Sequence, residues 1–440
     1  MVQIKTDATH DPARRSWVSS ANEGSDFPIQ NLPFGIYSHK DEAQCRFGIA
    51  IGDEILDVDA AFEAGLLKGK AAAAVRLGQG GALNDLFAAD ASLRQALRWD
   101  VVDLLDAATE TGRHAETLQA ILLRNQSDCQ MHLPTRIGDY TDFFAGIHHA
   151  RASFAQFRPD TPLPDNYKYV PIAYHGRAST VIPTGYEIHR PYGQHLKIPG
   201  QPPVFGPCER LDLELEMGFY IGRGNQRGEP IAIAEANEHI VGLCLLNDWS
   251  ARDIQGWEMY PLGPFLSKNF ATSVSPWVVT TEALAPFRGA IEPRPEGDPA
   301  PLPYLYDSND QAQGAFDIQL KVGLRTASMR HKGDPAVTII TSNARYLYWT
   351  FGQMITHHSI TGCRLQPGDL IGTGTISGPT REELSSMLEL TFSGTQPVIL
   401  PDGEKRGFLE DGDEVIFTAR CEREGFASIG FGGCSGTIIP

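Results

Sequence analysis

The chain has 440 residues, 42% of them hydrophobic, which is enough for roughly two or three domains with apolar cores. Its formal net charge of -17, with no basic run to offset it, argues against nucleic acid and anionic membranes as partners. No apolar segment approaches the length of a membrane-spanning helix, and the 7 cysteines are scattered without a Cys-x-x-Cys pair. These features predict a cytoplasmic protein with reduced thiols.

The first third of the chain reads as a polar segment followed by strands and then helices. Residues 1–22 lack the apolar stretch of a secretion signal, and we expect a flexible tail there. Short strands are predicted beyond it at 34–37, 46–51 and 55–58. Alanine-rich helices are predicted at 60–75 and at 91–124, the second of them broken by Gly112. Strands followed by helices favour an α+β domain over residues 23–132.

Residues 133–440 have a different composition. Proline and glycine are frequent, apolar runs are short and turn pairs recur, which together indicate a large β-rich domain. One helix is predicted inside it, from an N-cap at Ser342 to about Gly362.

Residues 211–217 alternate apolar and acidic side chains without a break. As one β-strand they would place Asp212, Glu214 and Glu216 on the same face, with neighbouring Cα atoms about 6.5–7 Å apart. On a solvated face these acids would have no special role. If the acids faced a cavity instead, their mutual repulsion would require a compensating cation, and the strand would form half of a metal site.

Two further acids have unusual surroundings. Asp142 is flanked by aromatic residues, which lower the local dielectric. Asp248 follows the apolar run 241–246 and so ends a strand that we expect to be buried, although a helix N-cap is the alternative. The segment after it places Asp248, Arg252 and Gln255 at i, i+4 and i+7 of a helical turn, with Lys268 nearby. This pattern fits either a surface ion pair or a charged site on a short, broken helix.

Histidines form the last group. His148 and His149 follow Asp142 closely enough for one of them to face the same cavity, although a structural role is the alternative. His357 and His358 end the predicted helix, where they favour its dipole, and we interpret them as structural. A grouping rich in carboxylates and without cysteine favours a hard cation, Mg²⁺ or Ca²⁺, over zinc.

Six motifs, taken together and in this order, resemble the fumarylacetoacetase (fumarylacetoacetate hydrolase) family. They are Asp-Tyr-Thr-Asp-Phe at 139–143, Tyr-His-Gly-Arg-Ala-Ser at 174–179, Leu-Asp-Leu-Glu-Leu-Glu-Met at 211–217, Asn-Asp-Trp-Ser-Ala-Arg-Asp-Ile-Gln at 247–255, Pro-Leu-Gly-Pro-Phe at 261–265 and Gly-Thr-Ile-Ser-Gly at 374–378. The likeness runs from about residue 25 to residue 432. It implies an α+β, mostly β fold, with an N-terminal SH3-like barrel with helices and a C-terminal mixed β-sandwich roll over 133–440, working as a homodimer.

The resemblance also implies an activity, the hydrolysis of 4-fumarylacetoacetate to fumarate and acetoacetate, which is the last step of tyrosine and phenylalanine breakdown. Carried over position by position, it implies Mg²⁺ or Ca²⁺ bound by Asp142, Glu214, Glu216 and Asp248, with Thr272 beside the metal. It implies His149 as the base and Glu389 as its partner, charge stabilisation by Arg252, Gln255 and Lys268, and substrate contacts from Arg158, Tyr174 and Thr375. Four carboxylates would then be balanced by the ion, Arg252 and Lys268.

Two positions depart from the family pattern, since Phe144 and Met259 stand where substrate-contacting tyrosines are usual. The alternatives are an acylpyruvate hydrolase, or an oxo-acid decarboxylase or hydratase of the same superfamily. These lyases generally lack a base like His149 and the long N-terminal unit, which argues against them. A β-protein that is stabilised by a cation and has no activity is the third possibility.

Overall fold

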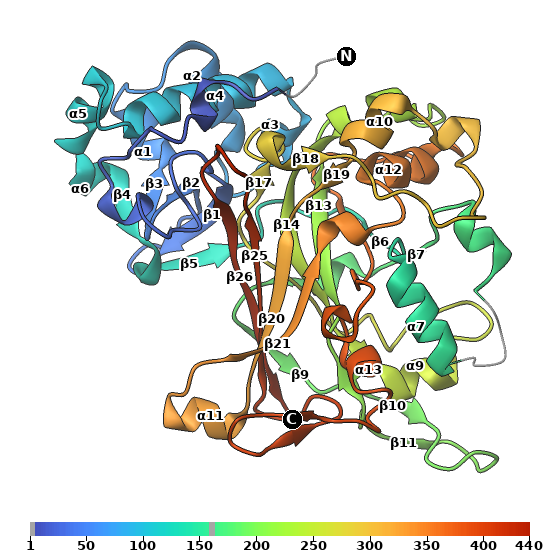
Figure 1. The fold of residues 1–440 in the computed structure, drawn as a ribbon. Helices are drawn as coiled ribbons and strands as arrows, with labels where there is room; N and C mark the ends of the chain where they lie inside the picture. The colour runs from blue at the N-terminus through green and yellow to red at the C-terminus, as the bar shows by residue number, and fades with distance from the viewer. Residues whose placement is uncertain (1–4, 158–162) are drawn as a thin grey trace.

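The N-terminal part of the fold is an antiparallel sheet covered by helices (Figure 1). The computed structural model describes residues 5–157 and 163–440. The sheet has the order β4-β3-β2-β1-β5, with β1 at Phe34–His39, β2 at Arg46–Ile51, β3 at Glu54–Asp57, β4 at Leu123–Asn125 and β5 at Cys129–His132. Its helices are α1 (Val58–Glu63), α2 (Gly69–Gly78), α3 (Asn84–Ala88), α4 (Ala91–Leu105), α5 (Glu110–Glu116) and α6 (Gln119–Leu122). The three predicted strands are confirmed.

The two long helices predicted here are each broken. The first is divided between α1 and α2, because Gly65 and Gly69 adopt positive φ angles of 72° and 52° that end one helix and precede the next. The break predicted in the second helix at Gly112 instead follows α4, since Gly112 lies within α5, where its N–H donates a hydrogen bond to the capping Thr109 side chain.

The segment expected to be a flexible tail is packed against the fold over the residues that the structure describes, 5–22. Thr9 and His10 are buried. The Arg98 guanidinium donates to Thr9 Oγ1 at 2.9 Å, and His10 Nε2 donates to the carbonyl oxygen of Glu282 at 2.9 Å. These partners lie far away along the chain, so composition gave no sign of them.

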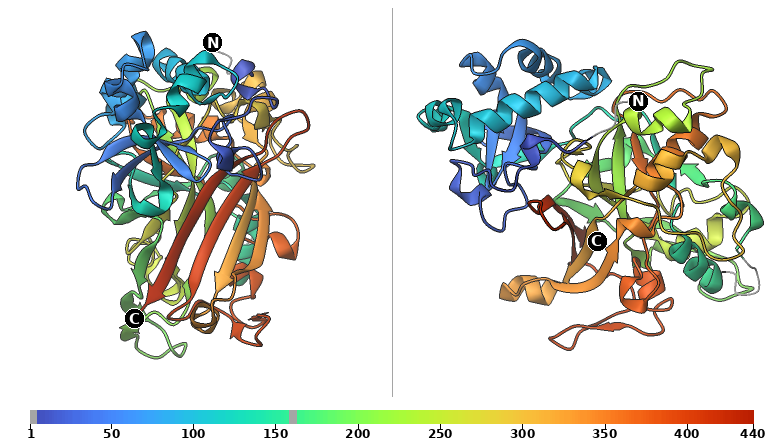
Figure 2. Two further views of the ribbon diagram at one scale, coloured as in Figure 1. Left: turned by 90° about the vertical axis from the view of Figure 1, so that its left-hand side faces the viewer. Right: turned by 45° about the horizontal axis from the view of Figure 1, so that its top comes forward.

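The larger part of the molecule contains two sheets (Figures 1 and 2). The eight-stranded sheet follows the order β7-β6-β22-β13-β14-β16-β8, with β17 beside β14. Its strands are β6 (Tyr140–Phe143), β7 (Ala173–His175), β8 (Val181–Pro183), β13 (Leu215–Ile221), β14 (Ile240–Asp248), β16 (Thr272–Val274), β17 (Val279–Thr280) and β22 (Leu370–Gly372). The five-stranded sheet follows the order β21-β20-β25-β26-β9, with β9 at Tyr186–His189, β20 at Gln319–Arg325, β21 at Val337–Asn343, β25 at Glu414–Cys421 and β26 at Ile429–Ile439.

Short elements complete this part. The helices are α7 (Ile147–Phe157), α8 (Ile233–Ala236), α9 (Arg252–Glu258), α10 (Ser308–Gln313), α11 (Ala327–Lys332), α12 (Phe351–Ser359) and α13 (Met387–Leu390). The two-stranded pairs are β10 (Tyr192–His195) with β11 (Val204–Pro207), β12 (Leu211–Asp212) with β15 (Ser250–Ala251), β18 (Arg288–Gly289) with β19 (Ala315–Phe316), and β23 (Val398–Ile399) with β24 (Lys405–Arg406). No helix within the described ranges is long and apolar enough to cross a membrane.

The helix predicted from Ser342 begins later than expected. Ser342 lies in β21, whose β-branched run Val337–Thr341 favours a strand. Helix α12 begins at Phe351, where Thr350 and Gln353 form a capping box. The helix ends at Ser359, close to the predicted end near Gly362, and its predicted start is wrong.

The eight-stranded sheet is covered on both faces, which explains why every residue of β13 and β14 is buried. Tyr220 and Leu246 belong to the apolar cluster of the N-terminal part. Their strand neighbours Phe219 and Leu245 belong to the other cluster, which the five-stranded sheet shares. Polar side chains at the ends of these central strands are therefore buried between layers.

Replacing Arg98 with alanine should loosen the N-terminal segment. The change removes hydrogen bonds to Thr9, Asn31 and Gln30, and a buried network of this kind contributes about 2–4 kcal/mol. We expect a lower free energy of unfolding in urea and faster proteolysis within residues 5–33. The control is Arg113→Ala on exposed helix α5, and equal behaviour of the two variants would contradict the packed segment.

Candidate active site

A cavity of about 380 Å³ opens where the central strands end. Its walls come from β6, β7, β13, α7, α9, the loop after α9 and the segment after β22. The lining residues are Asp142, Phe143, Phe144, His149, Ser153, Phe154, Ile172, Ala173, Tyr174, Glu214, Glu216, Arg252, Gln255, Met259, Leu262, Gly263, Pro264, Lys268, Gly374 and Thr375.

Strand register brings three acids together at this cavity. Asp142 lies opposite Gly372 on β22, β22 pairs with the β13 strand that carries Glu216, and β13 pairs with the β14 strand that ends at Asp248. Each acid offers a carboxylate oxygen, and these oxygens all lie within 4.8 Å of one another. Gly372 is required for this approach, because a Cβ there would lie 2.5 Å from Asp142 Oδ1.

The three acids carry more negative charge than their surroundings compensate. Burial and the neighbouring Asp248 carboxylate raise the pKa of Asp142 well above its usual range. Burial, with Asp142 and Asp248, does the same to the pKa of Glu216. Glu216 Oε1 and Asp248 Oδ1 are buried and accept no hydrogen bond from any residue that the structure describes. Unpartnered buried oxygens in a carboxylate set of this kind fit a hard divalent cation.

Glu214 lies beside the three acids but is paired with cations. Lys268 Nζ contacts both Glu214 and Asp248, and Arg252 Nη2 lies 2.8 Å from Glu214 Oε1. Burial tends to raise the pKa of Glu214, but the Lys268 and Arg252 charges outweigh it and lower that pKa. The structure therefore brings three of the four predicted ligands together, whereas Glu214 lines the same cavity but is held by Lys268 and Arg252.

Asp212 does not share the face of Glu214 and Glu216, so the expectation of one continuous acidic strand is wrong. Strand β12 pairs with β15 and ends at Asp212, while β13 pairs with β14 and begins at Leu215. The buried Asp212 carboxylate instead accepts from Arg252 Nε at 2.8 Å and from the first backbone N–H groups of α13, at 2.6 and 3.0 Å. Sequence reasoning missed this link, which joins Arg252 to the helix that carries Glu389.

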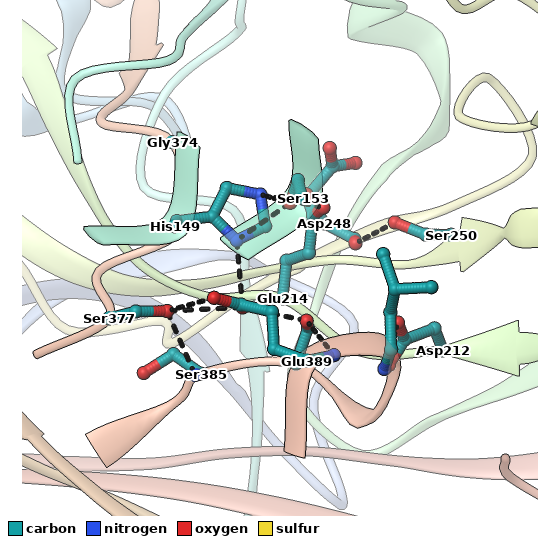
Figure 3. Close-up of polar contacts among 12 residues, drawn as sticks. His149, Ser153, Asp212, Glu214, Asp248, Ser250, Gly374, Ser377, Ser385 and Glu389 are labelled. Atoms are coloured by element: carbon teal, nitrogen blue, oxygen red, sulfur yellow. Dashed lines mark hydrogen bonds and ion pairs between the residues drawn. The ribbon is translucent and has the colours of Figure 1, made fainter. Parts of the chain in front are cut away.

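His149 and Glu389 form a buried pair beside the acids (Figure 3). His149 Nδ1 lies 2.7 Å from Glu389 Oε2, although 240 positions separate the residues. Glu389 also accepts from the hydroxyls of Ser377 and Ser386, at 2.9 and 2.8 Å. Burial tends to raise the pKa of Glu389, but His149 and these serines outweigh it and lower that pKa. An anionic Glu389 holds the proton on Nδ1, which leaves Nε2 as an acceptor.

Of the histidine alternatives, only His149 lines the cavity among the described residues. The His148 ring packs against Tyr346. His357 Nδ1 lies 2.9 Å from the Tyr304 hydroxyl, and His358 Nε2 lies 2.8 Å from Thr141 Oγ1.

Of the other predicted site residues, Tyr174, Gln255 and Thr375 line the cavity. The Tyr174 hydroxyl donates to Asp248 Oδ2 at 2.8 Å, and the buried Thr375 hydroxyl has no hydrogen-bond partner within the described chain. Gln255 Oε1 accepts from Arg252 Nη1 at 3.0 Å. Thr272 on β16 lies opposite Asp248, and Arg158 lies outside the described residues.

The two departures from the family pattern lie in the cavity wall. The Phe144 ring packs edge-on against the His149 ring, with centroids 5.3 Å apart. Met259 lines the cavity, while Tyr260 is 79% exposed and is not a lining residue. Tyr260 therefore does not replace the missing hydroxyl in this conformation.

Two family models match the chain. "Fumarylacetoacetase N-terminal" covers residues 30–134, and "Fumarylacetoacetate (FAA) hydrolase C-terminal" covers residues 140–438. The chain is 46% identical to the fumarylacetoacetase of Bos taurus over 422 residues, which is 95% of this chain and 97% of the relative. It is 45% identical to that of Homo sapiens over 420 residues, with the same shares. It is 44% identical to that of Oryza sativa subsp. japonica over 430 residues, or 97% of each chain.

Adding Mg²⁺ or Ca²⁺ to metal-depleted protein should raise its melting temperature. Cation binding to the folded state alone stabilises it by about 2.7 kcal/mol at a hundred times Kd. We expect Glu216→Gln to lose most of this shift, since it removes one of the charges that attract the ion, and exposed Glu229→Gln to keep it. An undiminished shift in Glu216→Gln, measured by calorimetry, would place the ion elsewhere.

Proposed function

The chain belongs to the fumarylacetoacetase family, and we propose that it hydrolyses 4-fumarylacetoacetate to fumarate and acetoacetate, the last step of tyrosine breakdown. The observation that carries this proposal is that His149, held by Glu389, lines the same cavity as Asp142 and Glu216, two of the three converging acids. The curated relatives named fumarylacetoacetase match nearly the whole chain, which supports the same activity.

We assign the metal to Asp142, Glu214, Glu216 and Asp248, with Thr272 beside it. The unpartnered oxygens of Glu216 and Asp248 support this assignment, and a donor set of carboxylates alone favours Mg²⁺ or Ca²⁺. A bound divalent ion would act as a Lewis acid toward the carbonyl oxygens of a β-diketone.

His149 is the general base in this mechanism. Its Nε2 takes a proton from the water that attacks one carbonyl carbon, while Nδ1 keeps its proton and donates a hydrogen bond to the Glu389 carboxylate, which stabilises the imidazolium. Glu389 is held for this role by three buried donors, His149, Ser377 and Ser386.

The carbon–carbon bond then breaks, its electron pair leaves with the other fragment as an enolate, and the enolate carbon takes up the proton that His149 removed from water. Arg252, Lys268 and Gln255 stabilise that negative charge. Burial tends to lower the pKa of Lys268, but Asp248 and Glu214 outweigh it and raise that pKa, so the ammonium stays charged. Gln255 accepts from Arg252 through Oε1, which leaves its amide N–H groups as donors toward the cavity. These groups are in place before charge develops, which is electrostatic preorganisation.

Substrate contacts are assigned to Tyr174, Thr375 and Arg158. The first two line the cavity, and the Thr375 hydroxyl is buried and available to bind a polar group. Phe144 and Met259 line the same space without a hydroxyl, so this chain binds the substrate with fewer hydrogen bonds there than the family pattern provides.

We also propose a homodimer with the domain arrangement of the family, an SH3-like barrel over 23–132 and a catalytic domain over 133–440. The five-stranded antiparallel N-terminal sheet supports the barrel. Large apolar side chains are exposed on the β10–β11 hairpin and on the loop after α9, including Phe205 at 75% and Leu262 at 97%. Exposed patches of this kind are typical of subunit interfaces, which supports the dimer.

Replacing His149 with alanine should lower kcat for fumarylacetoacetate by about 100-fold or more, because it removes the base. The measurement is the loss of ultraviolet absorbance of the substrate with metal-loaded protein. His148→Ala is a matched control on the same helix, and it should retain turnover because its ring packs against Tyr346. Undiminished turnover in the His149 variant would eliminate the proposed mechanism.

Restoring a hydroxyl at Phe144 should improve substrate binding. We expect Phe144→Tyr to lower KM for fumarylacetoacetate about fivefold, the effect of one hydrogen bond of about 1 kcal/mol, with little change in kcat. Phe62→Tyr, on helix α1 of the N-terminal part and away from the cavity, is the control. An unchanged KM would mean that residue 144 does not contact the substrate.

A further inference from the structure

Ser153 is a second polar group at the base, one helical turn beyond His149 on α7. It is buried and lines the cavity. Its Oγ lies 3.2 Å from His149 Nε2 and 3.4 Å from Nδ1 (Figure 3). The serine, the imidazole and Glu389 thus have the composition of a nucleophilic triad.

The geometry argues against a nucleophilic serine. In a triad the hydroxyl lies on the in-plane lone pair of the imidazole nitrogen, where it is much farther from the other ring nitrogen. The nearly equal distances of Ser153 Oγ from the two ring nitrogens place it over the face of the ring instead. The ring cannot turn its lone pair toward Ser153 without breaking the bond of 2.7 Å between Nδ1 and Glu389.

We propose that Ser153 is a positioning residue that orients the attacking water together with His149. A water on the lone pair of Nε2 donates one hydrogen to that nitrogen and lies within reach of Ser153 Oγ, because the hydroxyl is only 3.2 Å from Nε2. Ser153 accepts the second hydrogen, which leaves the oxygen lone pairs of the water directed away from the protein acceptors and toward the carbonyl carbon. This inference rests on the proposed hydrolysis.

The test compares Ser153→Ala with Ser153→Thr in the metal-loaded enzyme. We expect Ser153→Ala to lower kcat about 10- to 100-fold with little change in KM, and Ser153→Thr to recover most of the loss because it retains a hydroxyl. In a His149→Ala background the serine change should cause no further loss, since the two groups act on the same water. Ser328→Ala on α11 is the matched control and should leave kcat unchanged.

Two results would overturn the proposal. One is wild-type kcat in Ser153→Ala, or an effect confined to KM or to the melting temperature. The other is a loss as complete as that of His149→Ala, with an acyl adduct on Ser153 detected by mass spectrometry in the wild type, which would make the serine a nucleophile. Absence of hydrolysis by the wild-type protein would refute the proposed function itself, and so the two failures are distinguishable.

Discussion

Repulsion among buried carboxylates is the constraint on which the rest of the site depends. Asp142, Asp212, Glu214, Glu216 and Asp248 are all buried in one region, where Lys268 and Arg252 are the basic residues paired with them. The charges of Lys268 and Arg252 lower the pKa of Glu214, whereas burial and the neighbouring carboxylates raise the pKa values of Asp142 and Glu216. The oxygens of Asp142 and Glu216 converge with that of Asp248, which Lys268 also contacts, so a divalent ion at this point would compensate the carboxylates that the basic residues leave unbalanced.

The large sheet is buried on both faces, and this burial strengthens the interactions among these charges. Water is excluded from β13 and β14 by the N-terminal cluster on one face and the five-stranded sheet on the other. Carboxylates at the strand ends therefore interact strongly with one another and with cations. The N-terminal part thereby contributes to the catalytic site without lining the cavity.

Asp212 and Glu389 connect Arg252 to His149 through helix α13. Asp212 binds Arg252 and the start of α13, and α13 carries Glu389, which holds His149. A displacement of this short helix would move the His149 imidazole and the Arg252 guanidinium together. In contrast, Phe144 and Met259 line the cavity with apolar side chains that make no hydrogen bond in this network, although the Phe144 ring packs against His149.

Motif order was sufficient to predict the family, the residue types of the site and the early strands, because these depend on local pattern and on spacing along the chain. The alternation at 211–217 nevertheless misled, since it cannot reveal that β12 and β13 pair with different partners. Likewise, nothing in the polar composition of residues 5–22 indicated that Arg98 would bind Thr9.

The sequence by itself determined which chemical groups this protein has for its reaction. Tertiary structure alone decided which of two adjacent histidines faces the cavity, that Asp212 supports Arg252 rather than a metal, and that Ser153 lies over the imidazole ring. These outcomes depend on contacts between residues as far apart as His149 and Glu389, and such contacts follow from strand register and layer packing rather than from local sequence.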